Sequence, residues 1–291
     1  MKIIKGKKCK TILPYLSIIL VTSSVWLYWG NVSIQKTEIN INSEKIPASF
    51  NGFRIIHVSD LHNEEFGHNQ NKLLRAMKES SPNLIAVTGD LIDSRHTDLQ
   101  KALDFINGAV DIAPIYYVTG NHESRIHQYE KLKKHMAETG VITLNNKGTT
   151  IKWGVDSIRL LGLDDPSFTT NYNLSGRNAA IIDAKLKTMK NESSHYTILL
   201  SHRPELFHVY ADNRIDLVLS GHAHGGQIRL PLVGGLFAPN QGFFPKYSEG
   251  LYEKNQTKMV VSRGLGNSLF PVRINNRPQL VVITLVSQQD L

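Results

Sequence analysis

The sequence is poor in cysteine, because Cys9 is the only one among 291 residues. No disulfide can form within the chain, and a zinc site built from thiolates is excluded. The sequence also lacks internal repeats and low-complexity tracts, which excludes repeat architectures and a largely disordered chain. With 41% apolar and 20% charged residues, the composition is typical of a globular protein with a sizeable core.

Net positive charge is scarce outside the N-terminal segment. The formal net charge is +8, and the first ten residues contribute five of these charges without any acid: Lys2, Lys5, Lys7, Lys8 and Lys10. The rest of the chain therefore carries only +3 (8 minus 5). So small an excess does not predict a nucleic-acid surface, and we do not expect a nucleic-acid partner.

An uncharged run, TILPYLSIILVTSSVWLYWG, occupies residues 11–30. About 20 apolar residues suffice for a helix to span a bilayer, and Trp26, Tyr28 and Trp29 are typical of a membrane interface. We predict a basic cytoplasmic tail over 1–10, a single-pass transmembrane signal anchor over 11–30 and, by the positive-inside rule, an extracytoplasmic remainder at the cell membrane. A cleaved signal peptide is the alternative, but the bulky exit WLYWG favours an uncleaved anchor.

The remainder of the chain divides into a spacer with one strand, TEININS, over residues 31–50 and a domain over 51–291. Within the domain, five short apolar runs each end in a small polar cluster: FRIIHV before SDLH, NLIAV before TGD, PIYYV before TGNH, YTILL before SH, and IDLVL before SGH. Helical spacing in NQNKLLRAMKES and TDLQKALDFINGA separates the first three runs. This order predicts strands covered by helices, with ligands gathered at the carboxyl ends of the strands.

Short strands with turns follow over residues 142–163, and KMVVSRGLG and PQLVVITLV indicate further strands near the end of the chain. We therefore predict an α/β (α+β) fold in which two sheets pack together with helices outside them, as one domain.

The polar clusters at the strand ends contain residues that bind metals. They are Asp60, His62, Asp90, Asn121, His122, His202, His222 and His224. Imidazole, carboxylate and amide without thiolate suit Mn, Zn or Fe. The set is too large for one ion, so we predict two divalent metal ions bridged by the carboxylate of Asp90. Two ions about 3.5 to 4 Å apart can hold a hydroxide, because metal binding lowers the pKa of water toward ~7.

The ordered motifs SDLH, GDLID, GNHE, SHRP and GHAHGG resemble the calcineurin-like metallophosphoesterase family. The resemblance implies a four-layer double β-sandwich flanked by helices. By position, it assigns one metal to Asp60, His62, Asp90 and His224, and the other to Asp90, Asn121, His202 and His222. Residues two apart in an extended chain point the same way, and we expect His222 and His224 to use this to reach different ions.

Two further roles follow from the same resemblance. His122 corresponds to the family's non-ligand histidine, which protonates the leaving oxygen or stabilises the transition state, and Asp93 corresponds to the acid that orients it. The hydrophobic segment and the late stretch RGLGNSLFPVR resemble a bacterial, membrane-anchored branch of small phosphoesterases. Some members of that branch act on lipid-linked or cell-envelope phosphodiesters.

Four residues outside the motifs are candidates for substrate contact. Arg203, Arg263 and Arg273 suit phosphate because a guanidinium binds it through two parallel hydrogen bonds, although each could equally be salt-bridged or solvated. His68 follows SDLH closely enough to line the mouth of the site. The loop GGLFAPNQGFFPKY is a substrate-side loop, a lip near the bilayer, or a segment whose Phe243 and Phe244 pack in the core.

The sequence thus predicts a metal-dependent phosphoric ester hydrolase that cleaves a phosphodiester or pyrophosphate bond by attack of a metal-bridging hydroxide. Two alternatives stay open: a non-catalytic binding module at the membrane surface, and a metal-dependent nuclease that shares the same chemistry. The small charge of the domain and the predicted anchor speak against the nuclease.

Overall fold

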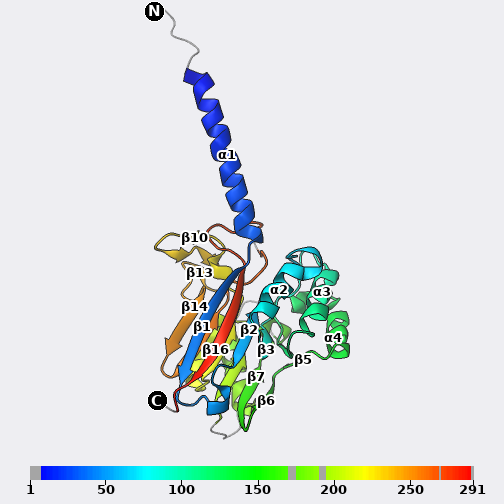
Figure 1. The fold of residues 1–291 in the computed structure, drawn as a ribbon. Coiled ribbons are helices and arrows are strands. Elements are labelled where there is room, and N and C mark those ends of the chain that lie inside the picture. The colour runs from blue at the N-terminus through cyan, green and yellow to red at the C-terminus, as the bar shows by residue number, and fades with distance from the viewer. Residues whose placement is uncertain (1–7, 170–174, 190–194, 269, 290–291) are drawn as a thin grey trace, which may run out of the picture.

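The computed structural model describes residues 8–169, 175–189, 195–268 and 270–289. Two six-stranded sheets form its centre (Figure 1). The first has the strand order β1 (Gln35–Ser43), β16 (Gln279–Ser287), β2 (Arg54–Val58), β3 (Leu84–Val87), β4 (Ile115–Tyr117) and β5 (Ile142–Thr143). The second has the order β14 (Gly250–Lys254), β15 (Thr257–Val261), β9 (Leu217–Ser220), β8 (Thr197–Leu200), β7 (Asp156–Gly162) and β6 (Lys147–Trp153).

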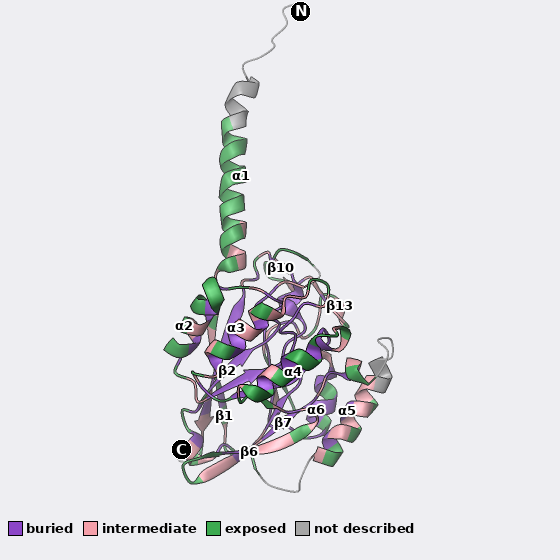
Figure 2. Ribbon diagram, turned by 90° about the vertical axis from the view of Figure 1, so that its right-hand side faces the viewer, coloured by how far each residue is buried: buried purple, intermediate pink, exposed green. Residues whose placement is uncertain are grey.

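Helices cover the outer faces of both sheets (Figure 2). The first sheet packs against α2 (Asn71–Glu79), α3 (Leu99–Ala109) and α4 (Tyr129–Glu138), and the second packs against α5 (Ser175–Met189) and α6 (Phe207–Asp212). A third apolar cluster joins the two sheets, with Ile55 and Val281 on one side and Ile198 and Leu219 on the other. The four layers confirm the predicted double β-sandwich.

The central strands bury both of their faces. In β16, Leu280 and Val282 pack toward the helices, whereas Val281, Ile283 and Leu285 pack between the sheets. Successive side chains of a strand point to opposite faces. A strand covered on both sides therefore needs apolar residues at every position, which explains the continuous apolar runs in the sequence.

The predicted strand of the spacer is β1, an edge strand of the first sheet. It pairs in parallel with β16 from Gln35 opposite Gln279 to Ser43 opposite Ser287. Ile41, Ile46 and Phe50 are buried. Residues 35–50 therefore pack as part of the folded unit that follows them.

Helix α1 (Lys8–Val32) projects away from the sandwich (Figures 1 and 2). Residues 14–32 are long and apolar enough to cross a membrane, with a mean hydropathy of 1.2, and are not buried inside the molecule. The helix extends beyond the predicted 11–30 at both ends. Most of the predicted basic tail, residues 1–7, lies outside the described residues.

Two small hairpins lie near the base of α1 (Figure 1). One pairs β10 (Arg229–Leu230) with β11 (Gly234–Gly235), and the other pairs β12 (Phe237–Ala238) with β13 (Gly242–Phe243). Both follow the GHAHGG motif in the chain.

Candidate metal centre

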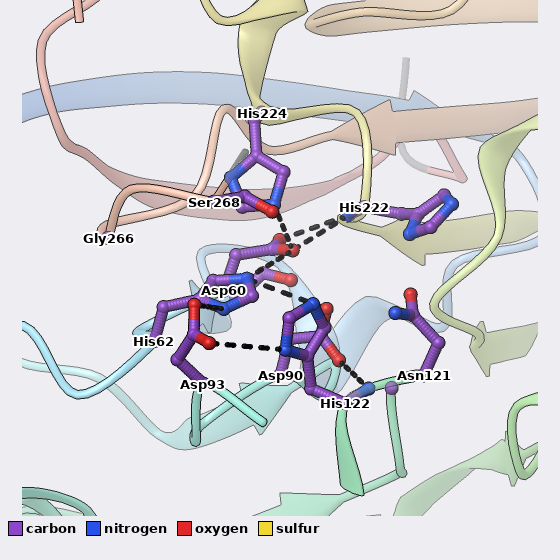
Figure 3. A network of polar contacts seen from close by, with 12 residues as sticks. Asp60, His62, Asp90, Asp93, Asn121, His122, His222, His224, Gly266 and Ser268 are labelled. Carbon is purple, nitrogen blue, oxygen red and sulfur yellow. Dashed lines mark hydrogen bonds and ion pairs between the residues drawn. The ribbon is translucent and has the colours of Figure 1, made fainter. Parts of the chain in front are cut away.

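The predicted ligands lie in loops at the carboxyl ends of five strands. Asp60 and His62 follow β2, Asp90 follows β3, Asn121 and His122 follow β4, His202 follows β8, and His222 and His224 follow β9. Strands β2, β3 and β4 run parallel to each other, as do β8 and β9. Parallel strands end at the same edge of a sheet, so the packed sheets bring these loops together (Figure 3).

The backbone is left-handed at five of the predicted ligands. The φ values are 52° at Asp60, 46° at His62, 52° at Asp90, 67° at His222 and 49° at His224. Residues with a Cβ adopt this region at a cost of about 1 to 3 kcal/mol, and such residues cluster at functional sites. The ligand loops therefore hold a strained geometry that the surrounding packing enforces.

The prediction that the chain is extended at His222 and His224 is wrong. Ala223 between them is right-handed (φ −80°, ψ −13°), so the segment alternates in handedness instead of continuing the strand. The two imidazoles nevertheless diverge. The ring of His222 lies 4.9 Å from that of His202, and the ring of His224 lies 4.9 Å from that of His62.

Two glycines permit the close approach of these loops. A Cβ at Gly221 would lie 1.9 Å from Oγ of Ser59 and 2.3 Å from Oδ2 of Asp60. Gly89 has φ +86°, and a Cβ there would lie 2.1 Å from the backbone nitrogen of Gly120. Any side chain at either position would displace the neighbouring ligand loop.

Asp60, His62, Asp90 and His224 form one group of potential ligands, whose donor atoms all lie within 4.8 Å of one another. Nε2 of His62 is 3.8 Å from Oδ1 of Asp60 and 3.5 Å from Oδ2 of Asp90. Nε2 of His224 is 3.3 Å from Oδ1 of Asp60. All four side chains are buried.

A second group of potential ligands comprises Asp90, His202 and His222, whose donor atoms also lie within 4.8 Å of one another. Nε2 of His202 is 3.2 Å from Oδ2 of Asp90 and 3.2 Å from Nδ1 of His222. Asn121 and His222 line one pocket, in which Asn121 lies beside His222 (Figure 3). Asp90 belongs to both groups, which is the position expected of a bridging carboxylate.

Charges in the cluster shift the pKa of its members. Burial opposes the charged imidazole of His202, but Asp90 and Asp60 raise its pKa to about 10. Burial likewise opposes the ionised carboxyl of Asp60, but His224, His62 and His202 hold its pKa below the ordinary value. Burial lowers the pKa of His224 to about 3. The cluster therefore combines ionised carboxylates with buried imidazoles.

The donor atoms fit divalent metal ions. Nδ1 of His202 lies 2.6 Å from the carbonyl oxygen of Thr88. A carbonyl only accepts, so this nitrogen carries the proton and Nε2 faces Asp90 as a ligand atom. Nε2 of His62 is buried and has no hydrogen-bond partner among the residues that the structure describes. An unpaired buried nitrogen facing two carboxylates is explained by a cation between them.

His122 and Asp93 lie within ion-pair distance of each other (Figure 3), but the shorter contact of His122 is with Ser94. Oδ1 of Asp93 is 3.9 Å from Nδ1 of His122, whereas the backbone nitrogen of Ser94 is 3.0 Å from that atom. Asp93 also forms an ion pair of 2.7 Å with Arg95, and its Oδ2 lies 3.6 Å from Nδ1 of His62. Burial lowers the pKa of His122 to about 4.

Arg203 lines the pocket, but its guanidinium is already paired. Nε is 2.5 Å from Oδ2 of Asp165 and Nη2 is 2.9 Å from Oδ1, so the two side chains form a buried bidentate ion pair. Nη1 donates to Oδ1 of Asn240 at 2.7 Å and lies 3.2 Å from Nε2 of His222. Arg203 therefore supports His222 and the wall of the pocket.

The other predicted substrate contacts lie elsewhere. Arg263 pairs with Glu249 at 3.0 Å. Arg273 is buried and donates to the backbone carbonyls of Arg263 and Gly266. His68 is exposed in the 3-10 helix η2 (His68–Gln70) and does not line the pocket. Intramolecular contacts thus account for Arg263 and Arg273.

Glu123 and Asp165 are site residues that the sequence reasoning missed. The carboxylate of Glu123 is buried and accepts hydrogen bonds from the backbone N–H groups of Asp90 (3.0 Å), Leu91 (2.8 Å) and Gly120 (2.8 Å). It thereby joins the loop of the bridging carboxylate to the loop of Asn121. Its position in the GNHE motif was the available signal. No such signal in the sequence pointed to Asp165, because its partner Arg203 is distant in sequence.

Four of the predicted ligands, Asp90, Asn121, His222 and His224, line a small pocket of about 120 Å³. Its lining comprises Asp90, Asn121, His122, Arg125, Arg203, His222, His224, Pro239, Asn240 and Ser268. It is therefore a polar recess at which carboxylates, imidazoles and a guanidinium converge.

Known proteins resemble this chain over most of its length. Residues 53–226 match the calcineurin-like phosphoesterase family. A metallophosphoesterase of Bacillus subtilis, YkuE, is 32% identical over 87% of this chain and 86% of its own length. A phosphodiesterase of Escherichia coli, YaeI, is 27% identical over 80% of this chain and 82% of its own. A Danio rerio protein named transmembrane protein with metallophosphoesterase domain is 28% identical over 91% of this chain and 61% of its own. With the buried cluster, these matches show that the chain is a metal-dependent phosphoester hydrolase and belongs to the calcineurin-like phosphoesterase family.

Proposed function

We propose that the chain is a two-metal phosphodiesterase, and that helix α1 anchors its folded domain at the outer face of the cell membrane. The observation that carries the proposal is the membership of Asp90 in both ligand groups, because a shared carboxylate is what two adjacent cations require. One ion is held by Asp60, His62, Asp90 and His224, and the other by Asp90, Asn121, His202 and His222. The donor set suits Mn, Zn or Fe.

The bound ions supply a hydroxide nucleophile at neutral pH and stabilise negative charge on the phosphate oxygens. The protein side chains orient the substrate beside them. The proton of the neutral His122 ring lies on Nε2, which can donate it in a hydrogen bond to the substrate, because Nδ1 accepts one from the backbone of Ser94. Of the two roles expected for His122, this favours stabilisation of the transition state over delivery of a proton. Asp93 acts on His62 and Arg95, and is not assigned to the orientation of His122.

The substrate class follows from the lining of the site and its proposed location. The small pocket of about 120 Å³, lined by potential metal ligands and by Arg203, is where we place the reacting phosphoryl group. We propose a phosphodiester or pyrophosphate, with lipid-linked and cell-envelope substrates favoured by attachment through α1. The relative YaeI, named a phosphodiesterase, supports the diester assignment.

Hydrolysis of an aryl phosphodiester with added Mn²⁺ tests the proposal, with the Asp90→Asn protein as the comparison. We expect the wild type to be active and the variant to lose both activity and one or both ions. Unchanged activity in Asp90→Asn would refute the bridging role. A panel of phosphomonoesters, aryl diesters, nucleotide diphosphate sugars and lipid-linked diesters then identifies the preferred class.

Attachment by α1 has its own test. Mass spectrometry of protein extracted from membranes should recover the lysine-rich residues 2–10, and protease added to intact cells should reach the domain. A mature N-terminus near residue 30 would show that the segment is a cleaved signal peptide.

A further inference from the structure

Large apolar side chains are exposed on two segments that follow the metal ligands in the chain. Leu232 is fully exposed, Phe243 is 72% exposed and Phe244 is 61% exposed. We call the complete set the apolar lip; its members are Leu230, Leu232, Val233, Phe243, Phe244, Phe270 and Val272. The alternative that Phe243 and Phe244 pack in the core is therefore wrong. An apolar group of this kind marks an interaction surface.

The two segments of the lip are joined to each other. Ile228, just before β10, forms a parallel bridge with Ile274, and the backbone nitrogen of Arg229 donates to the carbonyl of Ile274 at 3.0 Å. Behind the lip lies an apolar pocket of about 270 Å³, with Leu236, Phe237 and Phe243 among its lining residues. The lip is therefore one surface with a recess.

The later segment, which carries Phe270 and Val272, continues into residues that contact the end of α1. The side chain of Asn31 donates to the carbonyl of Arg273 at 3.0 Å and accepts from its backbone nitrogen at 2.7 Å. The guanidinium of Arg277 lies 4.5 Å above the ring of Trp29 and donates to the hydroxyl of Ser33 at 2.6 Å. The orientation of the lip relative to α1 is thus set by direct contacts.

A lipid bilayer is the partner that this surface fits. Only Ser33 and Ile34 separate α1 from β1, and two residues span at most about 7 Å. Trp26 and Trp29 near the end of α1 are typical of the membrane interface. The lip therefore lies beside the point where α1 would leave the membrane (Figure 1). Exposed Phe and Leu side chains enter the headgroup and acyl boundary to a depth of about 5 to 10 Å.

We propose that the apolar lip inserts into the membrane leaflet that α1 leaves, and so holds the metal pocket at the membrane surface. Pro239 and Asn240, between β12 and β13, and Ser268, two residues before Phe270, line that pocket. The loops that carry the apolar lip therefore also form part of the rim of the metal pocket. The proposal rests on the attachment by α1 proposed above, and it does not depend on the chemistry at the metals.

Site-specific fluorescence on the full chain tests the insertion. Cys9→Ser removes the native thiol, and single cysteines replace Leu232 and Phe243 for labelling with an environment-sensitive fluorophore. Val155→Cys is the aqueous control, because Val155 is 96% exposed in the turn between β6 and β7, far from α1 (Figure 1). Val21→Cys, within α1, reports membrane insertion of the helix. The vesicles contain phosphatidylethanolamine and phosphatidylglycerol.

The probes at positions 232 and 243 are expected to shift to the blue, to be quenched by nitroxide-labelled lipid and to lose quenching by aqueous iodide. The probe at position 155 should keep its emission wavelength, escape quenching by nitroxide-labelled lipid and remain quenched by iodide. Phe244→Asp, introduced into the Leu232→Cys protein, should move the fluorophore at position 232 from the membrane into water, so that iodide quenches it again. If lip probes match position 155 while position 21 is embedded, the lip proposal is overturned and the anchor stands. If position 21 is also in water, the anchor fails too.

Discussion

The backbone N–H of Ser94 donates a hydrogen bond to Nδ1 of His122 across 3.0 Å. The proton of the neutral imidazole therefore lies on Nε2. In this state the ring is a hydrogen-bond donor, because a second proton at Nδ1 would have to displace the Ser94 N–H. Burial, which lowers the pKa of His122 to about 4, favours the same neutral form.

His122→Ala is expected to lower kcat by about 10² to 10³, the usual effect of removing one preorganised donor. Because no complete proton transfer is assigned to His122, the loss should be similar for diesters with good and poor leaving groups. Steady-state rates on a series of aryl and alkyl phosphodiesters measure this. Metal content should stay unchanged.

Ser94→Ala is the matched control. It removes the hydroxyl, whose oxygen lies 3.1 Å from Nδ1 of His122, and keeps the backbone N–H that donates to the same atom. We expect its rates to stay within a few-fold of the wild type. A loss in His122→Ala that grows steadily as the leaving group becomes poorer would instead establish His122 as a general acid.

The buried pair of Arg203 and Asp165 predicts a large effect on stability. Asp165→Asn removes the bidentate partner of the buried guanidinium and leaves it only the longer ion pair with Glu205 (3.5 Å). Removal of one member of a buried pair costs about 3 to 5 kcal/mol, and we expect an effect toward the lower end of that range. Urea unfolding in detergent should show the lower midpoint. Lys134→Met, which breaks an exposed pair with Glu138 (3.8 Å), should leave the midpoint unchanged. Equal effects of the two substitutions would contradict the assignment.

Gly221→Ala is expected to disrupt the metal centre. The new Cβ would lie 2.3 Å from Oδ2 of Asp60, so either the carboxylate or the loop after β9 must move. Metal analysis of the purified variant should show a reduced content. Gly30→Ala, with no atom near its Cβ, should retain the wild-type content. Full occupancy in Gly221→Ala would show that the loop tolerates the shift.

Chelation should lower thermal stability as well as activity. Ions that bind only the folded chain stabilise it by about 2.7 kcal/mol at a free concentration 100 times their Kd. Thermal unfolding before and after EDTA, and again after Mn²⁺ is restored, measures this effect. His208→Ala, outside the ligand groups, should respond as the wild type does. An unfolding temperature insensitive to EDTA would argue against ions at the buried cluster.

Much of the fold was predictable because the relevant signals are local. The runs that became β2, β3, β4, β8 and β9 are apolar on both faces, and each ends in small polar residues that turn the chain. The order of these runs placed Asp60, Asp90 and His202 at one edge before any contact was known. Pairing of β1 with β16 was not predictable, because 244 positions (279 minus 35) separate their first partners, Gln35 and Gln279.

The detailed geometry of the site depended on distant contacts. Left-handed backbone at His222 and His224 is imposed by packing against Asp60 and neighbouring loops, whose effect a local pattern does not contain. For the same reason, the sequence leaves open whether Arg203 meets phosphate or an acidic side chain, and in the structure it pairs with Asp165. Exposure of Phe243 likewise depends on how its hairpin sits on the domain.

We propose that two ions share Asp90, with His224 on one and His222 on the other. Anomalous diffraction from crystals of the Mn²⁺-loaded protein locates the ions. Two peaks about 3.5 to 4 Å apart are expected, one on each side of the Asp90 carboxylate. A single peak, or both histidines on the same ion, would contradict the proposal.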